Sequence, residues 1–312
     1  MAYIRTETLG YDGLLSNIIA GPKYIESTVS SNESFWDDLK MSQTSGTEKT
    51  FYFIQNGIQN LVRNLTISPF SRAYTFSDSI YEVIPFYNRN FFYFDKHFTR
   101  LSNSLNALAI EINLQKVKDE LCELLKHVTY QNGYIYYQIS RGTDPIRNHI
   151  QVDGLEAETF GYILEHDYKT LELNVKIVDD LRWGRCDIKS TSLLANVMGM
   201  NEAKKENCQE IIMHRDGLIT EAGASNIFFV IDGIICTPAL GNNILPGITR
   251  EILIELVRSE GMEIREDKFL IDDLLKSQSV WLTSSTKCIA PVRKIVNLDL
   301  NLDLNEPIMN RC

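Results

Sequence analysis

Several features that would assign this chain to other protein classes are scarce in its sequence. The six cysteines are scattered, with neither the paired CxxC spacing of a zinc site nor the density of a disulfide-stapled secreted domain. We therefore expect reduced, buried thiols and no metal site. The N-terminal stretch MAYIRTETLGYDGLLSNIIAG lacks a basic segment followed by an unbroken apolar run, so the sequence predicts no secretory signal.

Long apolar runs and clustered positive charge are missing as well. Apolar stretches such as NIFFVIDGIIC are interrupted by Asp232 and Gly233 and are too short to cross a bilayer. The formal net charge of -10 and the lack of a basic stripe argue against a phosphate-backbone partner, because such binding needs clustered Lys and Arg. The sequence therefore predicts a cytoplasmic protein with no nucleic acid and no membrane as partner.

The composition separates the first fifty residues from the rest. Residues 27–50 are crowded with Ser, Thr, Asn and acidic side chains, and their apolar anchor is limited to Phe35, Trp36, Leu39 and Met41. We interpret residues 1–50 as an N-terminal extension whose order the composition leaves open, with one candidate helix around residues 35–41. The chain of 312 residues exceeds one usual compact core and its hydrophobic content of 44% is ample, so two domains or one large domain are both reasonable expectations.

The first half of the folded part shows strand patterns followed by helix patterns. FYFIQNGIQNL predicts a hairpin about Asn56 and Gly57, and SIYEVIPFYNRNFFYF predicts a second strand pair. Apolar residues then recur at steps of three and four over residues 98–112 and 114–128, which predicts two amphipathic helices packed on that sheet. Further strands are expected at YIYYQIS, AETFGYI and LELNVKIV.

In the second half, hairpin strands predominate and helices flank them. Helices are expected at STSLLANVMGMNEAKKEN, directly after Lys189, and at ITREILIELVRSEG. Strands are expected within QEIIMHRDGLITE, NIFFVIDGIICTP, MEIREDKFL and SVWLTSS. This order favours an α+β arrangement over a parallel doubly wound sheet. The sequence contains no internal repeat and no GxGxxG or GxxxxGK loop.

Four local signals in this half suggest a phosphate-bearing ligand beside a lysine. Lys189 stands between a predicted strand and a predicted helix, where a desolvated lysine can act as a nucleophile. Small residues after Glu221 let backbone N–H groups approach an anion, and Thr249 at a predicted helix start offers a second such geometry. Hydroxyl donors cluster in TSST, residues 283–286.

Each signal also has an ordinary structural explanation: a solvated surface lysine, a solvated carboxylate at a strand end, a helix cap and a turn. Taken together, they match the needs of pyridoxal phosphate. That cofactor requires an amine for its aldehyde, an anion for its ring nitrogen and donors for its phosphate.

Seven motifs occur in order from about residue 51 to the C-terminus: SRAYTFSDSIYEV, DKHFTRL, YYQISRGTDPIRNH, CDIKSTSLLANV, LITEAGASNIFFV, ILPGITRE and LTSSTKCIAPV. In this string the chain resembles the fold type IV pyridoxal-phosphate enzymes, which include D-amino acid aminotransferases, branched-chain aminotransferases and aminodeoxychorismate lyases. The resemblance implies an α+β fold, with a small α/β domain at residues 51–166 and a larger pseudo-barrel, cofactor-binding domain at residues 167–312.

The resemblance also implies roles for individual residues. Lys189 would carry the cofactor as a Schiff base and act as the catalytic residue, and Glu221 would pair with the pyridine nitrogen. A carboxylate there keeps the ring protonated, so the ring accepts electrons from the substrate's α-carbon while the freed lysine moves its proton. The remaining cofactor-binding residues that the family pattern implies are Arg100, Ser225, Ile248 through its amide, Thr249, Ser284 and Ser285.

The motif RGTDPIRNH distinguishes between the subfamilies. By resemblance to D-amino acid aminotransferases, Arg147 and His149, with Tyr81 of the YEV motif, would bind the substrate's α-carboxylate, for which an arginine fork and two further donors are suited. The alternative is that Arg147 and His149 belong to an exposed loop. Two departures concern the substrate pocket: Ser77 and Ser79 stand where those enzymes usually have glycines, and the loop before Arg147 is longer by one residue.

The predicted activity is transfer of the amino group of a D-amino acid such as D-alanine to a 2-oxo acid such as 2-oxoglutarate. The resemblance further implies a homodimer with shared active sites. Because TKCIAPVRKI resembles the branched-chain enzymes, a branched-chain L-amino acid aminotransferase remains an alternative, and an aminodeoxychorismate lyase is another. A cofactor-fold protein that serves only as a binding scaffold is a third, although such a scaffold would not need Lys189, Glu221 and Arg100 together.

Overall fold

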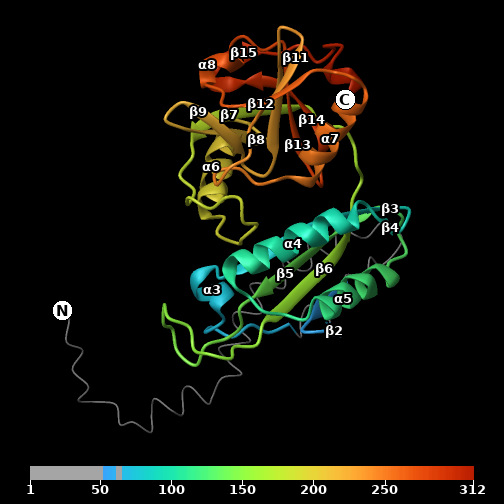
Figure 1. Cartoon of the computed structure of the whole chain (residues 1–312), viewed down its shortest axis with the longest axis vertical. Helices are drawn as coiled ribbons and strands as arrows, with labels where there is room; N and C mark the ends of the chain where they lie inside the picture. The colour runs from blue at the N-terminus through green and yellow to red at the C-terminus, as the bar shows by residue number, and fades with distance from the viewer. Residues whose placement is uncertain (1–51, 61–64) are drawn as a thin grey trace, which may run out of the picture. The chain divides into compact units, whose positions relative to one another are not determined.

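The computed structural model describes residues 52–60 and 65–312, and two β-sheets organise this part of the chain (Figure 1). The predicted extension at residues 1–50 and its candidate helix lie outside the described residues. The strands of the first sheet fall between residues 52 and 165, and those of the second between residues 173 and 301. The division into domains at residue 166 stays a prediction.

The strands of the first sheet are β1 Tyr52–Gln55, β2 Ile58–Asn60, β3 Ser79–Tyr87, β4 Asn90–Phe91, β5 Gly133–Ser140 and β6 Glu158–Glu165. They lie in the order β2-β1-β6-β5-β3-β4, and every neighbouring pair is antiparallel. Both predicted hairpins are confirmed. Asn56 and Gly57 take the positive φ angles that the tight turn between β1 and β2 requires.

The helices that accompany this sheet are α3 Arg72–Phe76, α4 Phe94–Leu108 and α5 Leu114–Lys126. The two predicted amphipathic helices are confirmed as α4 and α5, which lie on the same face of the sheet (Figure 1). Their buried leucines, among them Leu101, Leu105, Leu121 and Leu124, form one core with the inward side chains of β3, β5 and β6. The Asn113 side chain caps α5 by accepting two backbone hydrogen bonds from its first turn.

The second sheet consists of β7 Leu173–Asp179, β8 Glu210–Arg215, β9 Leu218–Ala222, β10 Asn226–Ile231, β11 Ile234–Pro238, β12 Ile264–Asp267, β13 Ser279–Ser284, β14 Cys288–Ile295 and β15 Leu300–Asn301. The order is β12-β11-β10-β13-β14-β7-β8-β9, with β15 beside β14. Most neighbours are antiparallel, whereas β7 runs parallel to both β8 and β14, and β11 runs parallel to β12.

This mixed sheet agrees with the predicted α+β class. The sheet is also curled, as the contacts of the edge strand β9 with β10 and β11, near the opposite edge, show. A curled sheet of this kind fits the predicted pseudo-barrel.

The α-helices of this half are α6 Leu194–Lys205, α7 Ile248–Ser259 and the short α8 Ile271–Leu274, and two 3-10 turns lie at Val296–Leu298 and Met309–Arg311. Helix α7 packs its buried Leu253 and Val257 against Phe228 and Trp281 of the sheet. The helix predicted directly after Lys189 begins only at α6, because the residues before it pair with the first sheet instead.

The segment around Lys189 joins the two sheets. The Lys189 carbonyl oxygen accepts a hydrogen bond from the Tyr81 amide (3.0 Å), and the Thr191 amide donates to the Ser79 carbonyl oxygen (3.0 Å). An isolated bridge pairs Ile80 with Ser190 in the same way. The lysine therefore lies where β3 of the first sheet meets the residues that lead into α6.

Within the described residues, no helix has both the length and the apolarity needed to cross a bilayer.

Candidate active site

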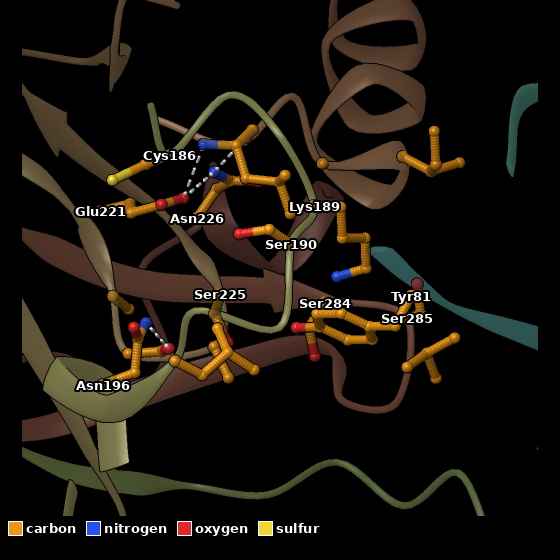
Figure 2. Close-up of a pocket in the computed structure, with 18 of the residues that line it drawn as sticks. Tyr81, Cys186, Lys189, Ser190, Asn196, Glu221, Ser225, Asn226, Ser284 and Ser285 are labelled. Atoms are coloured by element: carbon orange, nitrogen blue, oxygen red, sulfur yellow. Dashed lines mark hydrogen bonds between the residues drawn. The ribbon is translucent and has the colours of Figure 1, made fainter. Parts of the chain in front are cut away.

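A cavity of about 190 Å³ brings together nearly all of the predicted site residues. Its walls come from β3 and α4, from the segment before α6, from the turn between β9 and β10, from the start of α7 and from the end of β13 (Figure 2). Of the predicted residues, the cavity is lined by Tyr81, Arg100, Lys189, Glu221, Ser225, Ile248, Thr249, Ser284 and Ser285.

Lys189 directs its amine into this cavity. Figure 2 shows the amine in the space bordered by the Tyr81 ring and Ser284, and the nitrogen lies 4.2 Å from the centroid of that ring. The backbone on either side is held, since the Lys189 amide donates to Ser104 Oγ (3.2 Å) and its carbonyl accepts from Tyr81. The side chain thus extends from a fixed backbone, and among the residues that the structure describes its amine contacts the Tyr81 ring but no carboxylate.

Glu221, at the end of β9, occupies another wall of the cavity and is buried. Its Oε2 accepts hydrogen bonds from Asn226 Nδ2 (3.0 Å) and from the Leu245 amide (3.1 Å), and its Oε1 is ion-paired with Arg182. Burial raises the pKa of Glu221 to about 7, although the neighbouring Arg182 charge works in the opposite direction. A cation placed beside this carboxyl would therefore stabilise its charged form.

Arg182 is shared between two carboxylates. Its Nε and Nη2 bind the two oxygens of Asp180 at 2.8 and 2.7 Å, so that only Nη1 remains for Glu221. Arg215 also approaches Asp180, at 3.2 Å. Because two of the three guanidinium nitrogens of Arg182 bind Asp180, the positive charge of Arg182 balances the charge of Glu221 only in part.

Arg100 on α4 is part of a second buried pair. Its Nε and Nη2 bind both oxygens of Glu82 at 2.7 and 2.8 Å, and its Nη1 donates to the Pro246 carbonyl oxygen (3.1 Å). His97 Nδ1 lies 2.9 Å from the same carboxylate. Burial alone would raise the pKa of Glu82, but the Arg100 charge and these hydrogen bonds hold it far below its usual range.

The start of α7 presents free backbone donors to the cavity. The helix is capped by Gly247, so Ile248 and Thr249 are its first two residues, and the N–H groups of a first turn have no partner within the helix. Gly247, and not Thr249, is therefore the N-cap residue of the helix. A Cβ at position 247 would lie 2.0 Å from Asn226 Oδ1, so only glycine fits there.

Two buried polar atoms in residues that line the cavity have no hydrogen-bond partner within the described chain: Thr283 Oγ1 and Asn196 Oδ1. Buried groups of this kind are normally satisfied, so they point to a polar ligand in the cavity. An amine, a buried carboxylate and a helix start with neighbouring hydroxyls suit the aldehyde, ring nitrogen and phosphate of pyridoxal phosphate. The residues present therefore fit that cofactor.

The two remaining predicted residues lie elsewhere. Arg147 and His149 are exposed on the loop after β5 and do not line this cavity. The guanidinium carbon of Arg147 lies 4.6 Å from the centroid of the Phe76 ring, and the His149 ring lies 5.2 Å from it. Within a single chain, the structure does not bring this pair to Lys189.

The sequence did not single out Arg182, Asn226 or Asn196, and it named Thr283 only as a member of the TSST hydroxyl cluster. All four stand in or next to quoted motifs, since Asn226 follows AGAS directly and Thr283 opens TSST. Asn196 lies in CDIKSTSLLANV, and Arg182 precedes that motif closely. The available signal for Asn226 was a polar residue at the point where the small residues 222–225 give way to the apolar strand NIFFVI.

A cavity that combines these groups is that of a pyridoxal-phosphate enzyme, and the comparisons give the family. The chain belongs to the class IV aminotransferases, whose family pattern matches residues 79–295. It is therefore a pyridoxal-phosphate-dependent aminotransferase. The chain has the fold type IV architecture that its motifs predicted.

Individual relatives agree with this assignment. A D-alanine aminotransferase of Listeria monocytogenes is 35% identical over 240 residues, which are 74% of this chain and 82% of the relative. One from Staphylococcus epidermidis is 33% identical over 230 residues, 72% of this chain and 82% of the relative. Among solved structures, the Escherichia coli branched-chain amino acid aminotransferase superposes with a TM-score of 0.76 at 21% identity, covering 84% of this chain and 92% of that one. At that identity the likeness shows the fold alone.

Proposed function

We propose that this aminotransferase takes the amino group from a D-amino acid, such as D-alanine, and gives it to a 2-oxo acid, such as 2-oxoglutarate. The observation that carries the proposal is the identity of 33–35%, over nearly three quarters of the chain, to relatives named D-alanine aminotransferase. The cavity supports it with an amine, a buried carboxylate and an anion-binding helix start.

Lys189 is the proposed catalytic residue. Pyridoxal phosphate, when bound, supplies an electron sink that stabilises negative charge at the substrate's α-carbon. Lys189 Nζ would hold the cofactor covalently, and the same nitrogen, as a free amine, would accept the substrate's α-proton. Its backbone anchors to Tyr81 and Ser104 keep that nitrogen in reach.

Glu221 would keep the proton on the cofactor's ring nitrogen. The raised pKa of its carboxyl, caused by burial, is the signature of a site that gains from a neighbouring cation. Asn226 and the Leu245 amide orient the carboxylate by binding the same oxygen, Oε2. We assign cofactor binding to Arg100, Ser225, Ile248, Thr249, Ser284 and Ser285.

Substrate binding is assigned to Tyr81, Arg147 and His149. Because Arg147 and His149 are exposed and away from the cavity of their own chain, we propose that they complete the site of a second copy in a homodimer. We also propose that the enzyme works in the cytoplasm and that residues 51–166 and 167–312 form its two domains.

Three measurements test the proposal. Purified protein with D-alanine and 2-oxoglutarate should form pyruvate, and borohydride treatment followed by peptide mapping should label Lys189. In Arg147→Ala, activity should fall at least about tenfold with cofactor still bound, because a hydrogen bond to a charged group is worth about 1.5–3 kcal/mol. Arg311→Ala, an exposed arginine in the C-terminal turn, is the matched control and should behave as the wild type.

Other outcomes would assign another activity. Preference for L-leucine or L-valine as donor would replace the proposal with branched-chain transamination. Pyruvate released from aminodeoxychorismate without an amino acceptor would indicate a lyase. A protein that stays colourless with added pyridoxal phosphate would refute both the cofactor roles and the reaction.

A further inference from the structure

Two turns of the second sheet meet at the cavity wall. Strands β10 and β13 are antiparallel neighbours in which Asn226 pairs with Thr283. One residue further, Ser225 leaves the start of β10 while Ser284 ends β13, so the two serines come from adjacent strand ends. Both line the cavity, and Figure 2 shows them on the same side of it.

Lys287 contacts both of these turns. Its backbone amide donates to Ser284 Oγ (3.1 Å), and its Nζ donates to Ser225 Oγ (3.3 Å). The same ammonium is ion-paired with Glu210 Oε2 at 2.8 Å. Although Lys287 itself does not line the cavity, it binds two hydroxyls that do.

Glu210 explains why the ammonium is held in this position. The carboxylate is completely buried, and its other oxygen, Oε1, accepts from the Ile211 amide (3.1 Å). Because a buried charge without a partner is strongly destabilising, the Lys287 ammonium is required there. The backbone at Gly223 lies against the same carboxylate, since a Cβ at 223 would come within 2.6 Å of Glu210 Oε1.

These contacts link one network to two neighbouring turns in the same wall of the cavity. In the first turn, Ser225 Oγ lies 3.4 Å from Glu210 Oε2 and 3.3 Å from the ammonium. In the second turn, Ser284 Oγ accepts from the Lys287 amide, which leaves the hydroxyl proton of Ser284 available to an anion in the cavity. Lys287 therefore contacts the first turn through its ammonium and the second through its backbone amide.

We propose that Lys287 is a positioning residue of the cofactor site, which joins the Ser225 turn to the Ser284 turn through its buried pair with Glu210. The proposal rests on the proposed roles of Ser225 and Ser284 in cofactor binding. Lys287 acts through these hydroxyls, so its removal should loosen the cofactor while Lys189 and Glu221 remain in place.

The first experiment uses holoenzyme of Lys287→Met, which keeps the length of the side chain and removes its charge. Bound pyridoxal phosphate should dissociate roughly tenfold more readily, a change that corresponds to about 1.4 kcal/mol. The pH midpoint of the absorption of the bound cofactor should shift as well. Lys294→Met is the matched control, because Lys294 lies on β14, the strand that directly follows Lys287, but pairs with the exposed Asp299, and it should leave retention and absorption unchanged.

A second set of variants separates positioning from folding. Glu210→Gln combined with Lys287→Met removes the unpaired buried carboxylate, so this double variant should fold as well as the wild type by circular dichroism and still retain cofactor poorly. Ser225→Ala should weaken retention too, and its effect should not add to that of Lys287→Met, because both act through one hydroxyl.

Three results would overturn the proposal. Wild-type cofactor retention in Lys287→Met is the first and full recovery of retention in the double variant is the second, since either makes the pair merely structural. The third is strict additivity of Ser225→Ala and Lys287→Met. Failure of the proposed function would look different, because the wild type itself would then bind no pyridoxal phosphate or would not use D-alanine.

Discussion

Two buried carboxylates of the cavity region are each paired with an arginine, yet their protonation differs. Glu82 is held ionised, with its pKa far below the usual range, because the opposing effect of burial is outweighed by Arg100. Glu221 has a pKa raised to about 7, because there burial outweighs Arg182. Burial is similar in the two cases, at 0% and 5% exposure, so burial does not explain the difference.

The source of the contacts explains it, because each carboxylate has three polar contacts, but two of those to Glu82 come from its arginine and only one of those to Glu221 does. Arg100 gives its two-pronged face to Glu82, and His97 adds a third contact. Arg182 gives the corresponding face to Asp180 and reaches Glu221 with one nitrogen. The charge of Glu82 is thus balanced by Arg100 within the protein. The charge of Glu221 is balanced only in part by Arg182, so a further positive charge beside it would be stabilising. A buried ion pair can thus be structural or functional according to how its hydrogen bonds are distributed.

The largest effect is expected at the pair of Glu82 with Arg100. Arg100→Met would leave Glu82 charged, buried and without its fork, which typically costs about 3–5 kcal/mol of folding free energy. Denaturant unfolding followed by circular dichroism measures this loss. Adding Glu82→Gln to Arg100→Met should recover much of it, since no buried charge is then left alone. Equal stability of single and double variants would contradict the comparison.

Glu221 should give the cofactor-free protein a pH-dependent stability. Its carboxyl has a raised pKa of about 7 in the folded protein and an ordinary value near 4.5 when unfolded, so ionisation is harder in the fold. The free energy of unfolding should therefore fall as pH rises from about 4.5 to about 7, by about 3 kcal/mol in total.

The measurement compares wild type with Glu221→Gln across that pH range in denaturant. The variant should lack this part of the pH dependence, and saturating pyridoxal phosphate should suppress it in the wild type, because the ring cation then faces the carboxylate. If wild type and variant followed parallel curves, the assignment of the charge deficit to Glu221 would fail.

Glu221→Gln should also slow transamination of D-alanine at least about 100-fold while leaving the fold intact, because a neutral amide cannot hold a proton on the ring nitrogen by charge. Glu82→Gln, at the pair with Arg100, should change activity much less than stability. Steady-state rates at saturating cofactor test both. Similar activity losses in the two variants would remove the functional distinction between them.

The smallest effect is expected for an exposed ion pair that spans the same part of the molecule. Lys96 on α4 binds Glu251 and Glu255 on α7 at 2.6 and 2.8 Å, with both carboxylates about half exposed. Lys96→Met should therefore lower the free energy of unfolding by no more than about 1 kcal/mol, and this loss should be smaller still in high salt. A loss of stability comparable to that of Arg100→Met would show that burial does not decide how much stability a broken ion pair costs.

Much of the fold could be predicted because its signals are local. The helices α4 and α5 follow from apolar side chains repeated at three and four residue steps, and the turn between β1 and β2 follows from Asn56 and Gly57. The pairing of β7 with both β8 and β14 could not be predicted this way, because β14 is more than a hundred residues away along the chain. Parallel neighbours carry no turn signal between them.

The candidate site shows the same limit. Lys189 and Glu221 stand in motifs and were named from them, whereas Arg182 contacts Glu221 across 39 positions and Lys287 contacts Glu210 across 77. Nothing in the residues next to Arg182 or Lys287 specifies those partners. The groups proposed to react are therefore visible in the sequence, but the charges that lie around them could be identified only from the folded chain.

Asn226 spans two binding features with one short side chain. Its Nδ2 donates to Glu221 Oε2 and to the Leu245 carbonyl oxygen, at 3.0 and 2.9 Å, while its Oδ1 rests against Gly247 at the beginning of α7. One amide thus ties the carboxylate proposed to face the ring nitrogen to the helix start proposed to face the phosphate. A change of length or shape at position 226 should therefore disturb both ends of the proposed cofactor site together.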